Sequence, residues 1–282
     1  MSNYKAMARE ELAIGGFTAS RIAETFGDIL LQNSEWNPDN PVGINTLAAD
    51  FMDKAATWPP KQTILGITIP SLTIAITNAI TDGANIADVP AKLLTDEMCQ
   101  IAVANDGFAI RAIPSSRYTE NLLIKAIQNG GSIDGIEAHY ISEPVQMAAV
   151  AQSWSNLKFI PDNVQTEAAK LTAVKISGHA IQFIPVDKRS DEVLLEAVKS
   201  QPLSLEHIPD YQQTDEIIVE AVSRRGAAIQ FVRKEDQSDE VLQIALSDKT
   251  ININSISHSL RDDYKKLTRS PRRFSESSSL SL

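Results

Sequence analysis

Residues 190–198 read Ser-Asp-Glu-Val-Leu-Leu-Glu-Ala-Val, and the pattern returns as Thr-Asp-Glu-Ile-Ile-Val-Glu-Ala-Val at 214–222 and as Ser-Asp-Glu-Val-Leu-Gln-Ile-Ala-Leu at 238–246. The three segments start 24 residues apart. A fixed period of this length is typical of stacked repeat arrays, in which each copy packs mainly against its neighbours. The stretch Thr166–Ser257 therefore decides the fold class.

An aliphatic residue, usually followed by proline, marks every copy and allows the copies to be counted. These pairs are 24 residues apart, except for one step of 23 at Gly130-Gly131. Eight copies therefore occupy residues 71 to about 261. The pairs are Val89-Pro90, Ile113-Pro114, Ile136-Glu137, Ile160-Pro161, Ile184-Pro185, Ile208-Pro209, Val232-Arg233 and Ile256-Ser257.

Each copy after the first opens with a hydroxyl residue that has the character of a helix N-cap, because its side chain can accept a hydrogen bond from an amide of the first turn. Acids such as Asp191 and Glu192 follow it and favour the positive end of the helix dipole. Apolar residues lie three, four, seven and eight positions after the cap, which predicts one buried helical stripe with alanine at its closest contact. The caps are Thr95, Thr119, Ser142, Thr166, Ser190, Thr214 and Ser238.

About twelve residues after the cap, a glycine or proline such as Gly178 or Pro202 ends this first helix. The rest of the copy is either a short second helix or a strand of a leucine-rich type horseshoe. Apolar residues 14, 15 and 18 positions after the cap, as in Ala180, Ile181 and Ile184, favour a helix, because a strand would require strict alternation. Each copy is therefore predicted to be a short helical hairpin.

The recurring sequence resembles a known short repeat family of unknown function. The resemblance is carried by Glu192-Val-Leu-Leu-Glu-Ala-Val and Gly178-His-Ala-Ile-Gln-Phe and covers residues 71–261. Such tandem repeats are found in secreted effectors of intracellular bacteria and in proteins of large DNA viruses. The resemblance implies a helical-hairpin fold and location in a host cell after non-classical secretion, or in a virion. It assigns no catalytic residue.

The predicted architecture is all-α: a right-handed-type solenoid of about eight helical hairpins, residues 71–261, preceded by an N-terminal helical cap, residues 1–70. Residues 262–282 are basic and serine-rich and are expected to form a flexible tail. Gln62–Thr81 has no charged residue and is long enough to span a bilayer, but it contains five threonines and Pro70. We interpret it as including the first, degenerate copy, and we expect no cleavable secretory signal because the N-terminus lacks an apolar core.

Composition and motifs limit the kinds of binding and catalysis that the sequence predicts. The net charge of −10 makes nonspecific nucleic-acid binding unexpected. Cys99, the only cysteine, occupies a core position of its copy, and the four histidines lack metal-ligand spacing. The sequence contains no recognisable phosphate-binding, nucleophile or zinc motif. We therefore predict no catalytic residue, no metal site and no cofactor.

The function predicted from the sequence is that of a noncatalytic scaffold that binds a protein partner along the array. Two alternatives remain: an enzyme with its site near residues 33–58, and membrane association through residues 62–81, which is the weaker. Recognition is expected at positions that the period does not fix, where tyrosine and arginine are typical of interface hot spots. For the tyrosines, covering their own loop is an equally good interpretation. The candidates are Tyr118, Tyr140, Lys188, Arg189, Tyr211, Arg224 and Arg225.

Overall fold

The computed structural model describes residues 21–23, 25–26, 43–57, 63–64 and 66–248. The chain forms two compact units, Met1–Gln165 and Thr166–Leu282. The described part is predominantly helical, as the all-α prediction requires, and its only strands are two residues each. Residues 1–20 of the predicted cap, the anchor pair Ile256-Ser257 of the eighth predicted copy and the predicted tail, residues 262–282, lie outside the described residues.

The first unit begins with α3 (Gly43–Ala55), a hairpin of β1 (Thr63–Ile64) and β2 (Ile67–Thr68), and α4 (Ile69–Thr81). Thr68 caps α4 in a reciprocal pair with Ser71, the first residue of the predicted array. The uncharged stretch Gln62–Thr81 is thus divided between a hairpin and a 13-residue helix. Among the residues described, no helix is both long and apolar enough to cross a membrane.

In the first unit, η2 completes the copy that begins with α4, and three further copies each contribute one α-helix and one or two short 3₁₀-helices. Consecutive α-helices pack against one another from α4 to α7. The elements are α5 (Asp96–Asn105), α6 (Glu120–Gln128) and α7 (Glu143–Gln152), with η2 (Ile86–Asp88), η3 (Gly107–Ala112), η4 (Ser115–Arg117), η5 (Ala138–Tyr140) and η6 (Trp154–Phe159).

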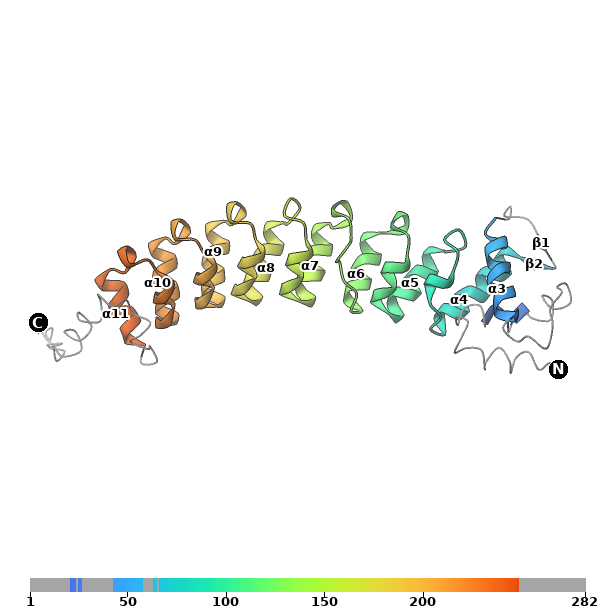
Figure 1. Cartoon of the computed structure of the whole chain (residues 1–282), viewed down its shortest axis with the longest axis horizontal. Helices are drawn as coiled ribbons and strands as arrows, with labels where there is room; N and C mark the ends of the chain where they lie inside the picture. Colours follow the sequence, from blue (N-terminus) through green and yellow to red (C-terminus); the bar gives the residue numbers. More distant parts are fainter. Residues whose placement is uncertain (1–20, 24, 27–42, 58–62, 65, 249–282) are drawn as a thin grey trace, which may run out of the picture. The chain divides into compact units, whose positions relative to one another are not determined.

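The second unit repeats this arrangement more regularly. Its α-helices lie side by side in chain order, with the 3₁₀-helices and turns along the upper side in Figure 1. The α-helices are α8 (Glu167–Ile176), α9 (Asp191–Ser200), α10 (Asp215–Arg224) and α11 (Asp239–Ser247). The 3₁₀-helices are η7 (Gly178–Phe183), η8 (Val186–Lys188), η9 (Pro202–His207), η10 (Asp210–Gln212), η11 (Gly226–Phe231) and η12 (Lys234–Asp236).

The second half of these copies is helical, which confirms the choice of helix over strand, but the helix is of the 3₁₀ type. In η7 the bonds join residues three apart, as from Ile184 N–H to the Ile181 carbonyl at 3.1 Å. Ala180, Ile181 and Ile184 are all buried. The six-residue helix and the anchor Ile184 that follows it therefore bury three apolar side chains, while Gln182 between them stays at the surface.

The predicted caps are confirmed at all positions but one. Six of the seven hydroxyls accept a hydrogen bond from the amide three residues later, as Thr214 does from Ile217 at 3.4 Å. Ser142 makes no such bond and instead donates to Glu120 at 2.6 Å. The first carboxylate of one copy thus binds the cap hydroxyl of the next, and Glu167 accepts from Ser190 in the same way.

Alanine at the seventh position after the cap permits close packing between copies. Ala197 is completely buried, and a Cβ atom built on Gly178 would lie 2.2 Å from its carbonyl oxygen. Glycine is therefore required at position 178 for the backbones of two copies to approach one another. The shortened copy departs from the pattern: Gly130 adopts a left-handed φ of 89°, and Ile133 is buried where Ile136 was expected to be the anchor.

Candidate functional site

The residue directly before the cap is called here the pre-cap residue. Before each of the last three α-helices, α9, α10 and α11, its side chain donates a hydrogen bond to a backbone carbonyl. Arg189 Nε donates to the Ile184 carbonyl at 2.9 Å, and the Nε2 atoms of Gln213 and Gln237 donate to Ile208 and Val232, both at 2.8 Å. Gln165 donates to Ile160 at 3.1 Å in the first unit. Each side chain thus satisfies the carbonyl of the aliphatic anchor that follows the six-residue 3₁₀-helix.

Two pre-cap residues also reach the following copy. Arg189 Nη1 donates to the His207 carbonyl at 2.7 Å, and Gln213 Nε2 to the Phe231 carbonyl at 3.1 Å. Long polar side chains at 24-residue spacing, immediately before the last four caps, are the sequence signal for this ladder of bonds. Sequence reasoning missed it because it assigned these positions to variable loops.

Arg189, a candidate for partner binding, is therefore also a structural residue. Burial lowers the pKa of its guanidinium, and the nearby Tyr211 opposes this effect. Its neighbour Lys188 is exposed, and the Lys188 carbonyl accepts a hydrogen bond from Lys170 Nζ at 2.8 Å. Of this adjacent pair, Lys188 has the side chain that faces solvent.

Tyr118 and Tyr140 contact each other in the first unit. Their ring centroids are 5.3 Å apart in an edge-to-face arrangement, and both side chains are half-buried. Tyr118 Oη donates to the Ile110 carbonyl at 3.1 Å, so this tyrosine covers its own loop. Burial and the proximity of Tyr140 raise the pKa of Tyr118.

Tyr211 has a different environment, because it is 79% exposed in η10. A tyrosine ring presents a large apolar surface at small cost in conformational entropy, which suits it to contact a partner. Lys188, Arg189 and Tyr211 all lie in the turns that precede the caps of α9 and α10. The structure thus brings together three of the predicted residues at one edge of the second unit.

Arg224 and Arg225 lie elsewhere, at the C-terminal end of α10. Both are exposed, and Arg224 forms an ion pair with Glu220 one helical turn earlier. A ten-residue helix is about 15 Å long, so these arginines are separated from the cap end of α10 by about that distance. They belong to a different edge from Tyr211.

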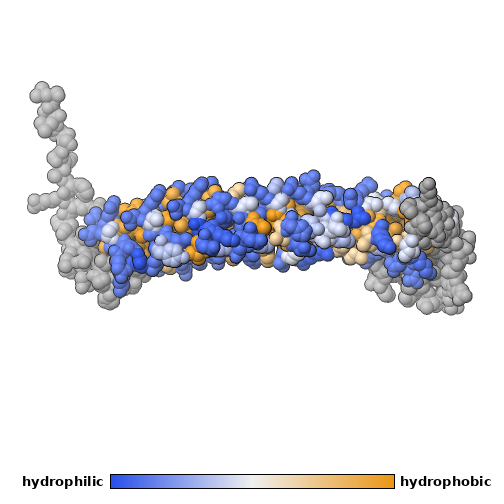
Figure 2. Space-filling view, turned by 90° about the horizontal axis from the view of Figure 1, so that it is seen from above, coloured by the Kyte–Doolittle hydropathy of each residue, from blue (hydrophilic) through white to orange (hydrophobic). Residues whose placement is uncertain are grey.

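A pocket of about 360 Å³ in the second unit is lined by Asp210, the residue that precedes Tyr211. Val186, Pro209 and Phe231, all partly exposed, supply apolar surface, and the acidic residues Glu206 and Asp210 line it as well. Figure 2 shows apolar residues as separate patches among polar ones on the face it displays. The pocket therefore combines apolar surface with negative charge.

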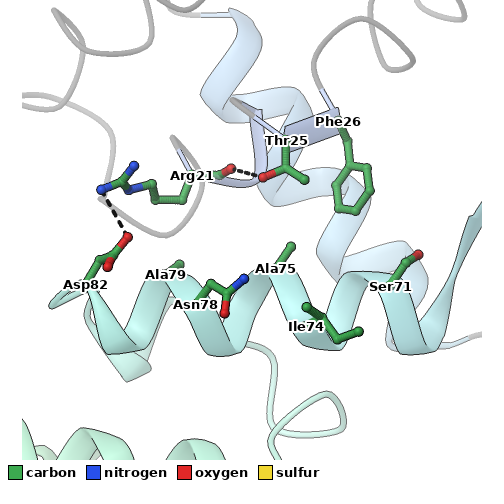
Figure 3. A pocket seen from close by; sticks show the side chains of 9 residues that line it. All are labelled: Arg21, Thr25, Phe26, Ser71, Ile74, Ala75, Asn78, Ala79 and Asp82. Carbon is green, nitrogen blue, oxygen red and sulfur yellow. Dashed lines mark hydrogen bonds and ion pairs between the residues drawn. The ribbon is translucent and has the colours of Figure 1, made fainter.

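The described part of the N-terminal region forms another pocket, of about 320 Å³, against α4 (Figure 3). Phe26 and the 62% exposed Ile74 line it, and Arg21 Nη2 lies 3.2 Å from Asp82 Oδ2 across one end. Among the described residues, the two ionisable groups that line this pocket thus form an ion pair with each other. Residues 33–42 and 58 of the predicted enzyme site, residues 33–58, lie outside the described part.

The remaining reactive groups are dispersed. Cys99 is buried in α5, and burial raises the pKa of its thiol, which disfavours the nucleophilic thiolate. The rings of His179 and His207 lie 5.7 Å apart. No group of three or more histidine, cysteine, aspartate or glutamate residues in the described ranges could hold a metal ion.

Comparison with known proteins gives one match. A family model described as a domain of unknown function (DUF4116) matches residues 190–237. This segment runs from the cap Ser190 to the pre-cap residue Gln237 and therefore contains two consecutive copies. No curated protein and no solved structure matches the chain. The occurrence in bacterial effectors and viral proteins stays a prediction from resemblance, and the chain is similar to an uncharacterised domain over these two copies.

Proposed function

We propose that this protein is a noncatalytic scaffold whose repeat array binds a protein partner. The observation that carries the proposal is that, in the second unit, the recurring residues have structural roles and the exposed Tyr211 does not. Residues that recur every 24 positions cap helices, fill the stripe or bind the backbone, whereas Tyr211 lies on the surface with no comparable internal role. A residue that is large, apolar and 79% exposed contributes little to folding and is suited to recognition.

The architecture that supports this proposal is a solenoid of about eight short hairpins covering residues 71–261. Caps with the same bonds in both units, and consecutive packing of α-helices within each, support it. Solenoids display variable side chains on extended surfaces, and each copy relies only on its neighbours for stability. Substitutions at exposed positions are therefore expected to alter binding without unfolding the array.

The proposal is tested by cross-linking the full chain in lysates of candidate host cells and quantifying captured proteins by mass spectrometry. Tyr211→Ala should reduce recovery of the specific partner, whereas Gln182→Ala, an exposed position in η7, should not. A chain lacking residues 1–70 should still capture the same partner. Loss of capture on this deletion, with Tyr211→Ala unchanged, would show that the array is not the binding element.

A further inference from the structure

We propose that the pocket lined by Glu206 and Asp210 binds a lysine or arginine side chain from an extended basic segment of the partner protein. This inference rests on the proposed binding function and gives the partner its chemistry. The pocket lies between η9 and η11 and has a volume of about 360 Å³. The volume is sufficient for one long side chain but not for a folded element.

The lining suits both parts of such a side chain. The partly exposed side chains of Val186, Pro209 and Phe231 would contact the aliphatic stem. The carboxylates of Glu206 and Asp210 would attract the terminal charge, and the face of an aromatic ring such as Phe231 also attracts cations. Among the described residues, no lysine or arginine lines this pocket.

Two arginines lie near the pocket, and each bonds a group other than the pocket carboxylates. Arg189 Nη1 donates to the carbonyl of His207, which lines the pocket, at 2.7 Å. Arg233 Nε lies 2.7 Å from Asp236 and 3.8 Å from Asp210, so its close partner is Asp236. Asp210 is about half exposed and Glu206 is exposed, which leaves both carboxylates accessible to a partner. An anionic ligand would be repelled by the same two groups.

The two acids are not required by the repeat. Glu206 is replaced by Gln182 in the preceding copy and by Gln230 in the following one, and Asp210 is replaced by Val186 and Lys234. Acids that serve as helix-start residues instead recur, as Asp191, Asp215 and Asp239 do. Within the regular second unit, therefore, both pocket carboxylates occur together in one copy, next to its exposed tyrosine.

The test uses the full chain and a fluorescein-labelled peptide, Gly-Leu-Arg-Gly-Leu-Arg-Gly, with binding followed by fluorescence anisotropy at low ionic strength. A second peptide carries citrulline in place of arginine and so keeps the shape while losing the charge. We expect Glu206→Gln combined with Asp210→Asn to weaken binding of the arginine peptide by about fivefold, as expected for two partly exposed ion pairs. The citrulline peptide should bind more weakly and be unaffected by the substitutions.

A matched control removes the same charge from the same edge outside the pocket: Asp187→Asn with Glu235→Gln, both at exposed 3₁₀ positions. It should lower the affinity by less than twofold. Equal losses in the two double variants would show general attraction to an acidic surface and overturn the pocket assignment. Equal binding of arginine and citrulline peptides would also overturn it. Neither outcome contradicts the proposed scaffold function, because that function is tested by the capture of a specific partner. Thermal unfolding of every variant checks that the variant is folded.

Discussion

At the scale of single residues, Arg189 illustrates how one side chain can serve both neighbouring copies. Its guanidinium donates hydrogen bonds to the carbonyls of Ile184 and His207, which belong to consecutive copies. Arg189→Leu would leave both carbonyls without this donor and is expected to cost about 1–3 kcal/mol in free energy of unfolding. Arg189→Gln should cost less, since glutamine makes the equivalent bonds at 213. Urea denaturation measures the free energy of unfolding of both variants. Equal losses of stability in the two variants would show that these hydrogen bonds do not stabilise the fold.

Gly178 gives a second test at this scale, because its position is set by contact rather than by φ. A methyl group there would collide with the Ala197 carbonyl, so Gly178→Ala should destabilise the second unit by about 1–3 kcal/mol. Ser177→Ala provides the control, as the Ser177 side chain makes no cap bond, and should change stability by less than about 0.5 kcal/mol. An unchanged melting temperature for Gly178→Ala would contradict the close approach.

At the scale of elements, the caps define where each α-helix begins. Thr214→Ala removes the bond to the Ile217 amide and is expected to cost about 1 kcal/mol, seen as faster hydrogen exchange in the first turn of α10. Ser142→Ala removes no cap bond from α7 and should leave exchange at the start of that helix nearly unchanged. Similar acceleration of hydrogen exchange at the starts of α7 and α10 would indicate that the hydroxyl does not stabilise the helix through the cap hydrogen bond.

The carboxylate of Glu167 links the starts of α8 and α9 and gives stability a pH dependence. Burial alone would raise its pKa, but hydrogen bonds from Lys170 and Ser190 outweigh burial and lower it below the ordinary value. A lowered native pKa stabilises the fold above the unfolded-state pKa, and this contribution is lost as the pH falls through the native value.

Chemical denaturation of Glu167→Gln and of the unsubstituted chain from pH 7 to pH 3 measures this contribution. The variant should lose less stability over the acidic part of this range, because its side chain cannot be protonated there. Glu216→Gln, at an exposed helix start in the same unit, is the control. Parallel pH profiles for Glu167→Gln and the unsubstituted chain would rule out the linkage.

At the scale of the whole molecule, the two units differ in regularity. The packing of α8 on α9, α9 on α10 and α10 on α11 is contained within residues 166–282. Since repeat proteins are stabilised by contacts between neighbouring copies, this segment should retain a helical far-ultraviolet circular dichroism spectrum when expressed alone. A spectrum typical of an unfolded chain would show that its stability depends on the first unit.

The sequence by itself determined the class of fold, because period, caps and stripe are local features. The caps from Thr166 to Ser238 and the buried positions of α9 follow directly from spacing. It also identified Tyr211 as a recognition candidate, since solvent exposure is expected wherever the period imposes no residue. The sequence could not show that Tyr211 is exposed and Tyr118 is half-buried, because both are tyrosines in loops before a cap.

Only the tertiary structure decided which of these side chains is free to contact a partner. Tyr118 folds back onto the Ile110 carbonyl and Arg189 bridges two copies, whereas Tyr211 remains at the surface. The pocket with Glu206 and Asp210 likewise forms only when η9 and η11 pack together. Local spacing along the chain specifies the turn of a helix, but hydrogen bonds and cavities between copies depend on distances that arise only after the copies stack.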